Sequence, residues 1–156
     1  MDESKRLELI VEAIRYCQRV RQMGMPPSCF TKALREPIFF LWECRRERNK
    51  DRVARFRSAS TLGVQRGRGA LRYDHAVPFK YLQDELLNRQ DLAGESVRAV
   101  LDCYGVAVLI TAEDEERLDR AGLRNRMPAG WDGADPLARY KAVGIELVEN
   151  GRSSPG

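Results

Sequence analysis

The segment Val106–Ile110 is a short, uninterrupted run of apolar residues, which is typical of a strand buried on both of its faces. Thr111 follows it directly and can serve as the N-cap of a helix. The residues Glu113 to Glu115 then form an acidic first turn, which suits the positive end of a helix dipole. We therefore expect a buried strand that leads into a helix from Ala112 to about Ala121.

The first fifty residues have helical periodicity. Apolar residues recur every three or four positions at Leu7, Ile10, Val11, Ile14, Cys17 and Val20. This spacing predicts an amphipathic helix over residues 4–23, which ends at Gly24 before two prolines. A short helix with Ser28 as its N-cap is expected to run to Leu34, and another is expected over residues 38–48.

Residues 53–58 and 70–74 alternate between apolar and polar side chains, so we expect two half-buried strands that pair as a hairpin. Further elements are predicted as helices over 78–88, 95–104 and 136–142 and a strand over 145–148. The chain is expected to be a single α+β domain over residues 1–149, with a helical part (1–50) and a strand-and-helix part (51–149). The helical part would pack on a small mixed or antiparallel sheet with several short helices, and residues 150–156 would form a disordered tail.

The composition is that of a folded protein, since 43% of the 156 residues are hydrophobic and 32% are charged. No apolar run approaches the roughly 18–20 residues that cross a bilayer, and the polar N-terminus has no signal-peptide core. We expect a cytoplasmic protein without a membrane partner. The four cysteines are widely spaced, and buried thiols are a better interpretation than a zinc site or disulfides.

Positive charge is concentrated in the first half of the chain, where residues 1–70 hold 16 Lys and Arg against 8 Asp and Glu. The excess lies mainly in Arg45, Arg46, Arg48, Lys50, Arg52, Arg55, Arg57, Arg66 and Arg68. Such a stripe can neutralise phosphates and bind nucleic acid without regard to sequence. The interleaved Glu43, Glu47 and Asp51 are equally consistent with a solvated helix face held by ion pairs.

His75 is the only histidine of the chain, and Asp74 precedes it at the end of a predicted strand. A histidine in this position is a candidate general base or metal ligand. The alternative is a structural histidine that forms a hydrogen bond near the end of its strand.

The segment Asp74-His75-Ala-Val-Pro78 resembles the first motif of HNH (His-Me finger) endonucleases, and residues 106–116 resemble the second strand of that family entering its helix. The resemblance implies that His75 is the base and Asp74 a ligand of Mg²⁺ or Mn²⁺. Glu115, or its neighbour Asp114, would take the place of the second histidine of that family, which this chain lacks. Carboxylates in that place would suit either cation.

These observations predict a nucleic-acid-acting protein, with DNA a better expectation than RNA. It would be a divergent metal-dependent phosphodiesterase or endonuclease of the HNH kind. The alternative is a non-catalytic domain that binds nucleic acid or serves as a protein–protein adaptor, so the sequence leaves open whether the chain is an enzyme.

Overall fold

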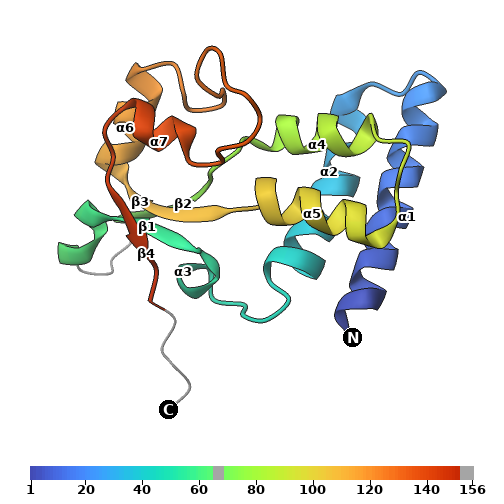
Figure 1. Ribbon diagram of the computed structural model, residues 1–156, viewed down its shortest axis with the longest axis horizontal. Helices are drawn as coiled ribbons and strands as arrows, with labels where there is room; N and C mark the ends of the chain where they lie inside the picture. The colour runs from blue at the N-terminus through green and yellow to red at the C-terminus, as the bar shows by residue number, and fades with distance from the viewer. Residues whose placement is uncertain (65–68, 152–156) are drawn as a thin grey trace. The chain divides into compact units, whose positions relative to one another are not determined.

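The computed structural model describes residues 1–64 and 69–151 and has an α+β fold, as expected from the sequence (Figure 1). Contacts within the chain divide it into two compact units. Unit 1 consists of Met1–Arg48 and Phe79–Gly105, and unit 2 consists of Asn49–Pro78 and the chain from Val106 onward. Residues 79–105, which the sequence assigns to the strand-and-helix part, therefore belong with the N-terminal helices.

Unit 1 is helical. Its elements are α1 (Glu3–Gln22), α2 (Pro27–Pro37), the π-helix η1 (Ile38–Glu43), α4 (Phe79–Leu87) and α5 (Gly94–Tyr104). The predicted apolar stripe of α1 is buried and packs with residues of the other helices in one core. Asp2 caps α1 by accepting a hydrogen bond from the Lys5 amide at 2.8 Å, and Gly24 has the left-handed backbone (φ 95°) that lets the chain turn after this helix.

Two local expectations in unit 1 were wrong. Ser28 is not an N-cap, because α2 already begins at Pro27, where a proline is favoured as it needs no hydrogen-bond acceptor. The next element is a π-helix that ends at Glu43 rather than an α-helix that reaches Arg48. Pro37 lacks the amide hydrogen that a regular α-helix would use at this point, so the hydrogen-bond pattern changes there.

Unit 2 contains a four-stranded mixed sheet in the order β2-β3-β1-β4. The strands are β1 (Phe56–Ser58), β2 (Leu71–His75), β3 (Ala107–Thr111) and β4 (Leu147–Glu149). The apolar run forms β3, whose five residues are all buried, and it pairs antiparallel with β2 and parallel with β1. The expected hairpin between the first two strands was wrong, because β3 lies between β1 and β2 and forms the hydrogen-bonded pair with each of them.

The two faces of this sheet have different coverings (Figure 1). On one face, α6 (Ala112–Arg120) and α7 (Ala138–Ala142) contribute Leu118 and Tyr140 to a core with Val108 and Ile110. On the other face, the short helix α3 (Lys50–Val53) leads to Ala54, which packs with Ala107 and Leu109. A side chain of β2 or β3 therefore packs either toward α6 and α7 or toward the α3 segment, depending on which face of the sheet it lies on.

The start of α6 is as predicted, since Thr111 caps it and accepts from the Asp114 amide at 3.1 Å. The start of β1 is not, because Asn49 caps α3 and turns residues 50–53 into a helical turn. Asn150, which the sequence places in the tail, donates from its side chain to the carbonyl oxygens of Asp51 and Ala54 at 2.7 and 2.8 Å. The rest of the predicted tail from residue 152 lies outside the described residues.

Two further expectations concern cysteines and membranes. Cys17 is buried as expected, but Cys29 is exposed at the start of α2, where it lies off the apolar face. Within the described residues, no helix is both long enough and apolar enough to cross a membrane.

Candidate nucleic-acid interface

Asp74 and His75 lie on opposite faces of the sheet. In the β2–β3 pair, Asp74 is opposite Val108 and His75 is opposite Ala107. Residues opposite each other in an antiparallel pair share a face, and successive residues alternate between faces. Val108 belongs to the core under α6 and α7, whereas Ala107 belongs to the cluster on the α3 side. The pair that carries the HNH resemblance is therefore divided between the two faces.

The Asp74 carboxylate is held by two buried side chains of α7. It accepts a hydrogen bond from the Tyr140 hydroxyl at 2.5 Å and forms an ion pair with Arg139 Nη1 at 3.0 Å. Burial, followed by the Asp74 charge, raises the pKa of Tyr140 well above its ordinary value, so its hydroxyl remains a donor. Arg139 is only 1% exposed, and it supplies the Asp74 carboxylate with a partner of opposite charge inside the fold.

The Asp114 carboxylate serves the structure around the start of α6. Its Oδ2 accepts hydrogen bonds from the hydroxyls of Ser58 at 2.6 Å and Ser60 at 2.8 Å, and from the Thr111 amide at 3.1 Å. Burial raises the pKa of Asp114, but the hydrogen bonds lower it by more, and the net effect is a lowered pKa. The carboxylate is thus kept ionised by donors that the chain itself provides.

Glu115 forms ion pairs with Arg72 and Arg124, each at 3.7 Å. The three predicted metal ligands Asp74, Asp114 and Glu115 therefore make separate sets of contacts, each with its own donors. Over residues 1–64 and 69–151, no group of three or more His, Cys, Asp or Glu side chains is placed to hold a metal ion. The metal role of these residues stays a prediction.

His75 lies beside an aromatic side chain that the sequence analysis did not single out. The Tyr73 ring is on the same face two residues earlier, and it meets the His75 ring edge to face with 5.4 Å between centroids. The Lys50 ammonium lies 5.8 Å from the centre of the Tyr73 ring. We call Lys50, Tyr73 and His75 the Tyr73 face; the alternation of β2 could have revealed its aromatic pair, but not the lysine from α3.

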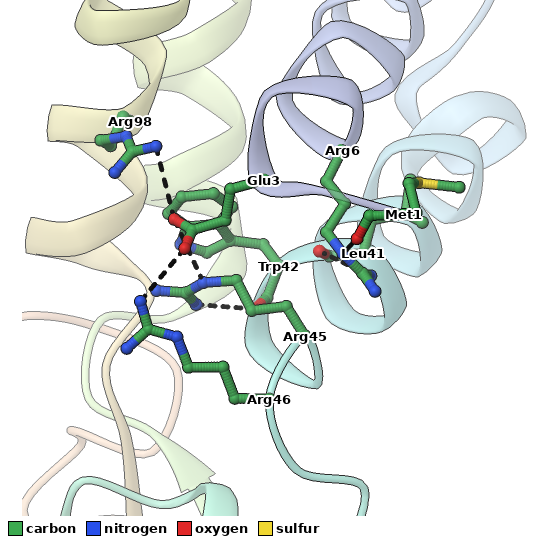
Figure 2. A network of polar contacts seen from close by, with 8 residues as sticks. All are labelled: Met1, Glu3, Arg6, Leu41, Trp42, Arg45, Arg46 and Arg98. Carbon is green, nitrogen blue, oxygen red and sulfur yellow. Dashed lines mark hydrogen bonds and ion pairs between the residues drawn. The ribbon is translucent and has the colours of Figure 1, made fainter.

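The nine predicted phosphate-binding cations fall into three groups. Exposed side chains are those of Arg46, Arg48, Lys50, Arg52 and Arg55. Arg45 and Arg57 are partly buried. Arg45 contacts Trp42 and Glu3 (Figure 2). Arg57 donates to the Thr61 hydroxyl and carbonyl at 2.7 and 3.0 Å. Arg66 and Arg68 lie outside the described residues. Of these nine predicted cations, the ones described as exposed in unit 2 are Lys50, Arg52 and Arg55, all within or just after α3.

No protein-family model, curated protein or solved structure matches this chain.

Proposed function

We propose that unit 2 binds nucleic acid through the Tyr73 face and the exposed cations of the α3 segment. The observation that carries this proposal is the register of β2, which puts Tyr73 and His75 side by side on the face where Lys50 lies against Tyr73. Aromatic rings can stack on nucleic-acid bases, and adjacent cations can neutralise phosphates. A partly exposed aromatic pair with Lys50 beside it, and with Arg52 and Arg55 a few residues further along the chain, combines the two kinds of contact that bind single strands.

Phosphate contacts are assigned to Lys50, Arg52 and Arg55. All three are exposed and come from a stretch of six residues that holds one carboxylate, Asp51. Arg57 donates hydrogen bonds to Thr61, so we assign it a structural role and no phosphate contact. We expect DNA as the ligand, and RNA is the comparison that tests this preference.

The test measures the salt dependence of binding to a labelled single-stranded DNA by fluorescence anisotropy. Replacing Lys50, Arg52 and Arg55 together with alanine should lower the slope of log K against log salt by about 2, since each phosphate contact on a single strand contributes about 0.7. The matched control replaces Lys5, Arg15 and Lys32, which are exposed cations in unit 1 with their own glutamate partners. An equal loss of slope in both triple variants would refute the assignment of the interface.

Stacking is tested at Tyr73. Alanine at this position should weaken binding by about 1–3 kcal/mol, whereas phenylalanine keeps the ring and should keep most of the affinity. Both variants must retain the circular dichroism spectrum of the wild type, because Tyr73 also packs against the cluster of Ala54, Ala107 and Leu109. Equal affinity of the folded alanine variant and the wild type would exclude stacking on Tyr73.

Phosphodiester cleavage is a second candidate, supported by the order of the elements. His75 ends β2 and β3 enters α6, as the HNH resemblance implies, and the two strands pair antiparallel. The carboxylates do not fit a metal as they are placed, since Asp74 is bound by Arg139 and Tyr140 and Asp114 by hydroxyl and amide donors. We therefore derive no metal-dependent step from this geometry.

The cleavage assay incubates DNA and RNA with the protein in Mg²⁺ or Mn²⁺, with the His75→Ala variant alongside. Catalysis by this site requires that the wild type cleaves and that the variant does not. Equal cleavage by both proteins, or none by either, rejects it and leaves the binding proposal unaffected.

A further inference from the structure

Three arginine side chains of unit 1 converge on the carboxylate of Glu3 (Figure 2). Arg46 Nη2 lies 3.1 Å from the carboxylate, Arg98 Nη2 3.3 Å and Arg45 Nε 3.7 Å. Glu3 is the first residue of α1, Arg45 and Arg46 follow η1, and Arg98 belongs to α5. Segments far apart in the sequence therefore bring three guanidinium groups to one place.

This cluster holds more positive charge than Glu3 can balance. Asp102 also acts on Arg45 through space, and all three guanidinium groups share the single carboxylate of Glu3. The buried Nε of Arg45 has no hydrogen-bond partner among the described residues, although it faces the carboxylate. An unsatisfied donor and an excess of cations favour an acceptor with more oxygens and more charge than a carboxylate.

The Trp42 ring holds two of these arginines in place. The guanidinium of Arg45 lies 4.0 Å from the centre of this ring, and that of Arg98 lies 5.6 Å from it. Stacking on the ring face leaves the N–H edge of a guanidinium available to an anion, and that edge matches phosphate oxygens. Trp42 itself is 3% exposed, so the platform is part of the core of unit 1.

We propose that Arg45, Arg46 and Arg98 bind a phosphate group, which displaces the Glu3 carboxylate. The side chain of Glu3 is 30% exposed and belongs to the first turn of α1, so it can turn into solvent without disturbing the core. In the absence of phosphate, the Glu3 carboxylate therefore occupies the position that the phosphate group would take. The inference concerns unit 1 alone and does not depend on the Tyr73 face.

The key variant is Glu3→Gln, which removes the competing charge. It should tighten the binding of inorganic phosphate, measured by isothermal titration calorimetry, by roughly fivefold, because an exposed ion pair contributes up to about 1 kcal/mol. Arg98→Ala should weaken phosphate binding by about tenfold. The matched controls are Glu12→Gln and Arg15→Ala, which form an ion pair on α1 at 2.7 Å and should leave phosphate binding unchanged.

A short single-stranded oligonucleotide, measured by anisotropy, is the second probe. A tightening by Glu3→Gln for both probes means that a free phosphate group is sufficient, whereas a tightening for the oligonucleotide alone identifies backbone phosphates as the ligand. If Glu3 only links the helices through its ion pairs, Glu3→Gln will lower the melting temperature and leave the affinities for phosphate and for the oligonucleotide unchanged. That result would overturn the proposal. An equal effect of Glu12→Gln also overturns it.

The two proposals fail separately. If the α3 cations prove necessary for DNA binding while Glu3→Gln and Arg98→Ala have no effect, the proposed function stands and the phosphate site in unit 1 falls. The reverse result removes the Tyr73 face and retains the phosphate site.

Discussion

Replacement of Arg139 with methionine should destabilise unit 2 by about 3–5 kcal/mol, which is the usual cost of removing one partner of a buried ion pair. The guanidinium donates to Asp74 at 3.0 Å and to the carbonyl oxygens of His75, Ala76, Leu123 and Arg124 at 2.9, 3.2, 2.7 and 2.9 Å. It therefore ties the end of β2 to the segment after α6.

The magnitude follows from these contacts. Four hydrogen bonds to carbonyls contribute about 1 kcal/mol each, and the bond to the Asp74 carboxylate contributes about twice that. The methionine side chain recovers about 2 kcal/mol by burying apolar surface in the same space. The remaining loss of about 4 kcal/mol is a large share of the 5–15 kcal/mol that is typical of a folded protein.

Equilibrium urea unfolding gives the change in the free energy of unfolding, and hydrogen exchange of β2 and β3 assigns this change to unit 2. Arg120→Met removes an exposed arginine at the end of α6 and should cost less than about 0.5 kcal/mol. A double-mutant cycle with Asp74→Asn measures the coupling between the two charged groups. A loss below about 1 kcal/mol in Arg139→Met would show that water replaces these contacts and would refute the reasoning.

Three further predictions concern both units. Hydrogen bonds, led by the one from Ser58, hold the pKa of Asp114 below its ordinary value of 3.8. The Asp114 carboxylate therefore stabilises the fold above that pH. This contribution is lost as the pH falls through the lower pKa of the folded state. Asp114→Asn should thus cost about 1–2 kcal/mol near pH 7 in urea unfolding, and the difference from the wild type should disappear in acid. Leu118→Ala should lower the free energy of unfolding by about 2–5 kcal/mol, because the side chain is 1% exposed in the core beneath α6; a loss under about 1 kcal/mol would contradict this packing. The Cys29 thiol should react quickly with a thiol reagent, whereas Cys17, whose pKa is raised by burial, should react only on unfolding.

The elements best predicted from the sequence are those whose signals are local. The burial of β3 follows from its own apolar run, and the start of α6 follows from Thr111 and the acidic turn after it. Segment 53–58 was less predictable, because its alternation is consistent with a strand from Val53, whereas the helical turn capped by Asn49 includes Val53 and the strand begins only at Phe56. The false hairpin has another cause, since the partner of a strand is chosen by distant residues and alternation does not specify it.

Much of the candidate site depends on such distant residues. Asp74 was visible in the sequence, but its partners Arg139 and Tyr140 are more than sixty positions away and belong to a helix with no distinctive motif. Likewise, Lys50 reaches Tyr73 only because α3 lies on the same face of the sheet. The interleaved acids indicated that ion pairs would hold part of the basic stripe, but the sequence did not reveal that Glu3 of α1 pairs with Arg45 and Arg46.

The way in which the chain passes between its two units has a consequence for how it folds. Residues 79–105 of unit 1 lie between β2 and β3, which are neighbours in the sheet of unit 2. No single cut can separate the units, since each is assembled from two stretches of chain. Pairing of β2 with β3 must close a loop that contains α4 and α5, and this closure costs less entropy once the helices have shortened the intervening segment. We therefore expect the helices to form before the sheet. A mutation in the core of unit 1 should then slow the folding of unit 2, although no residue of unit 2 is changed.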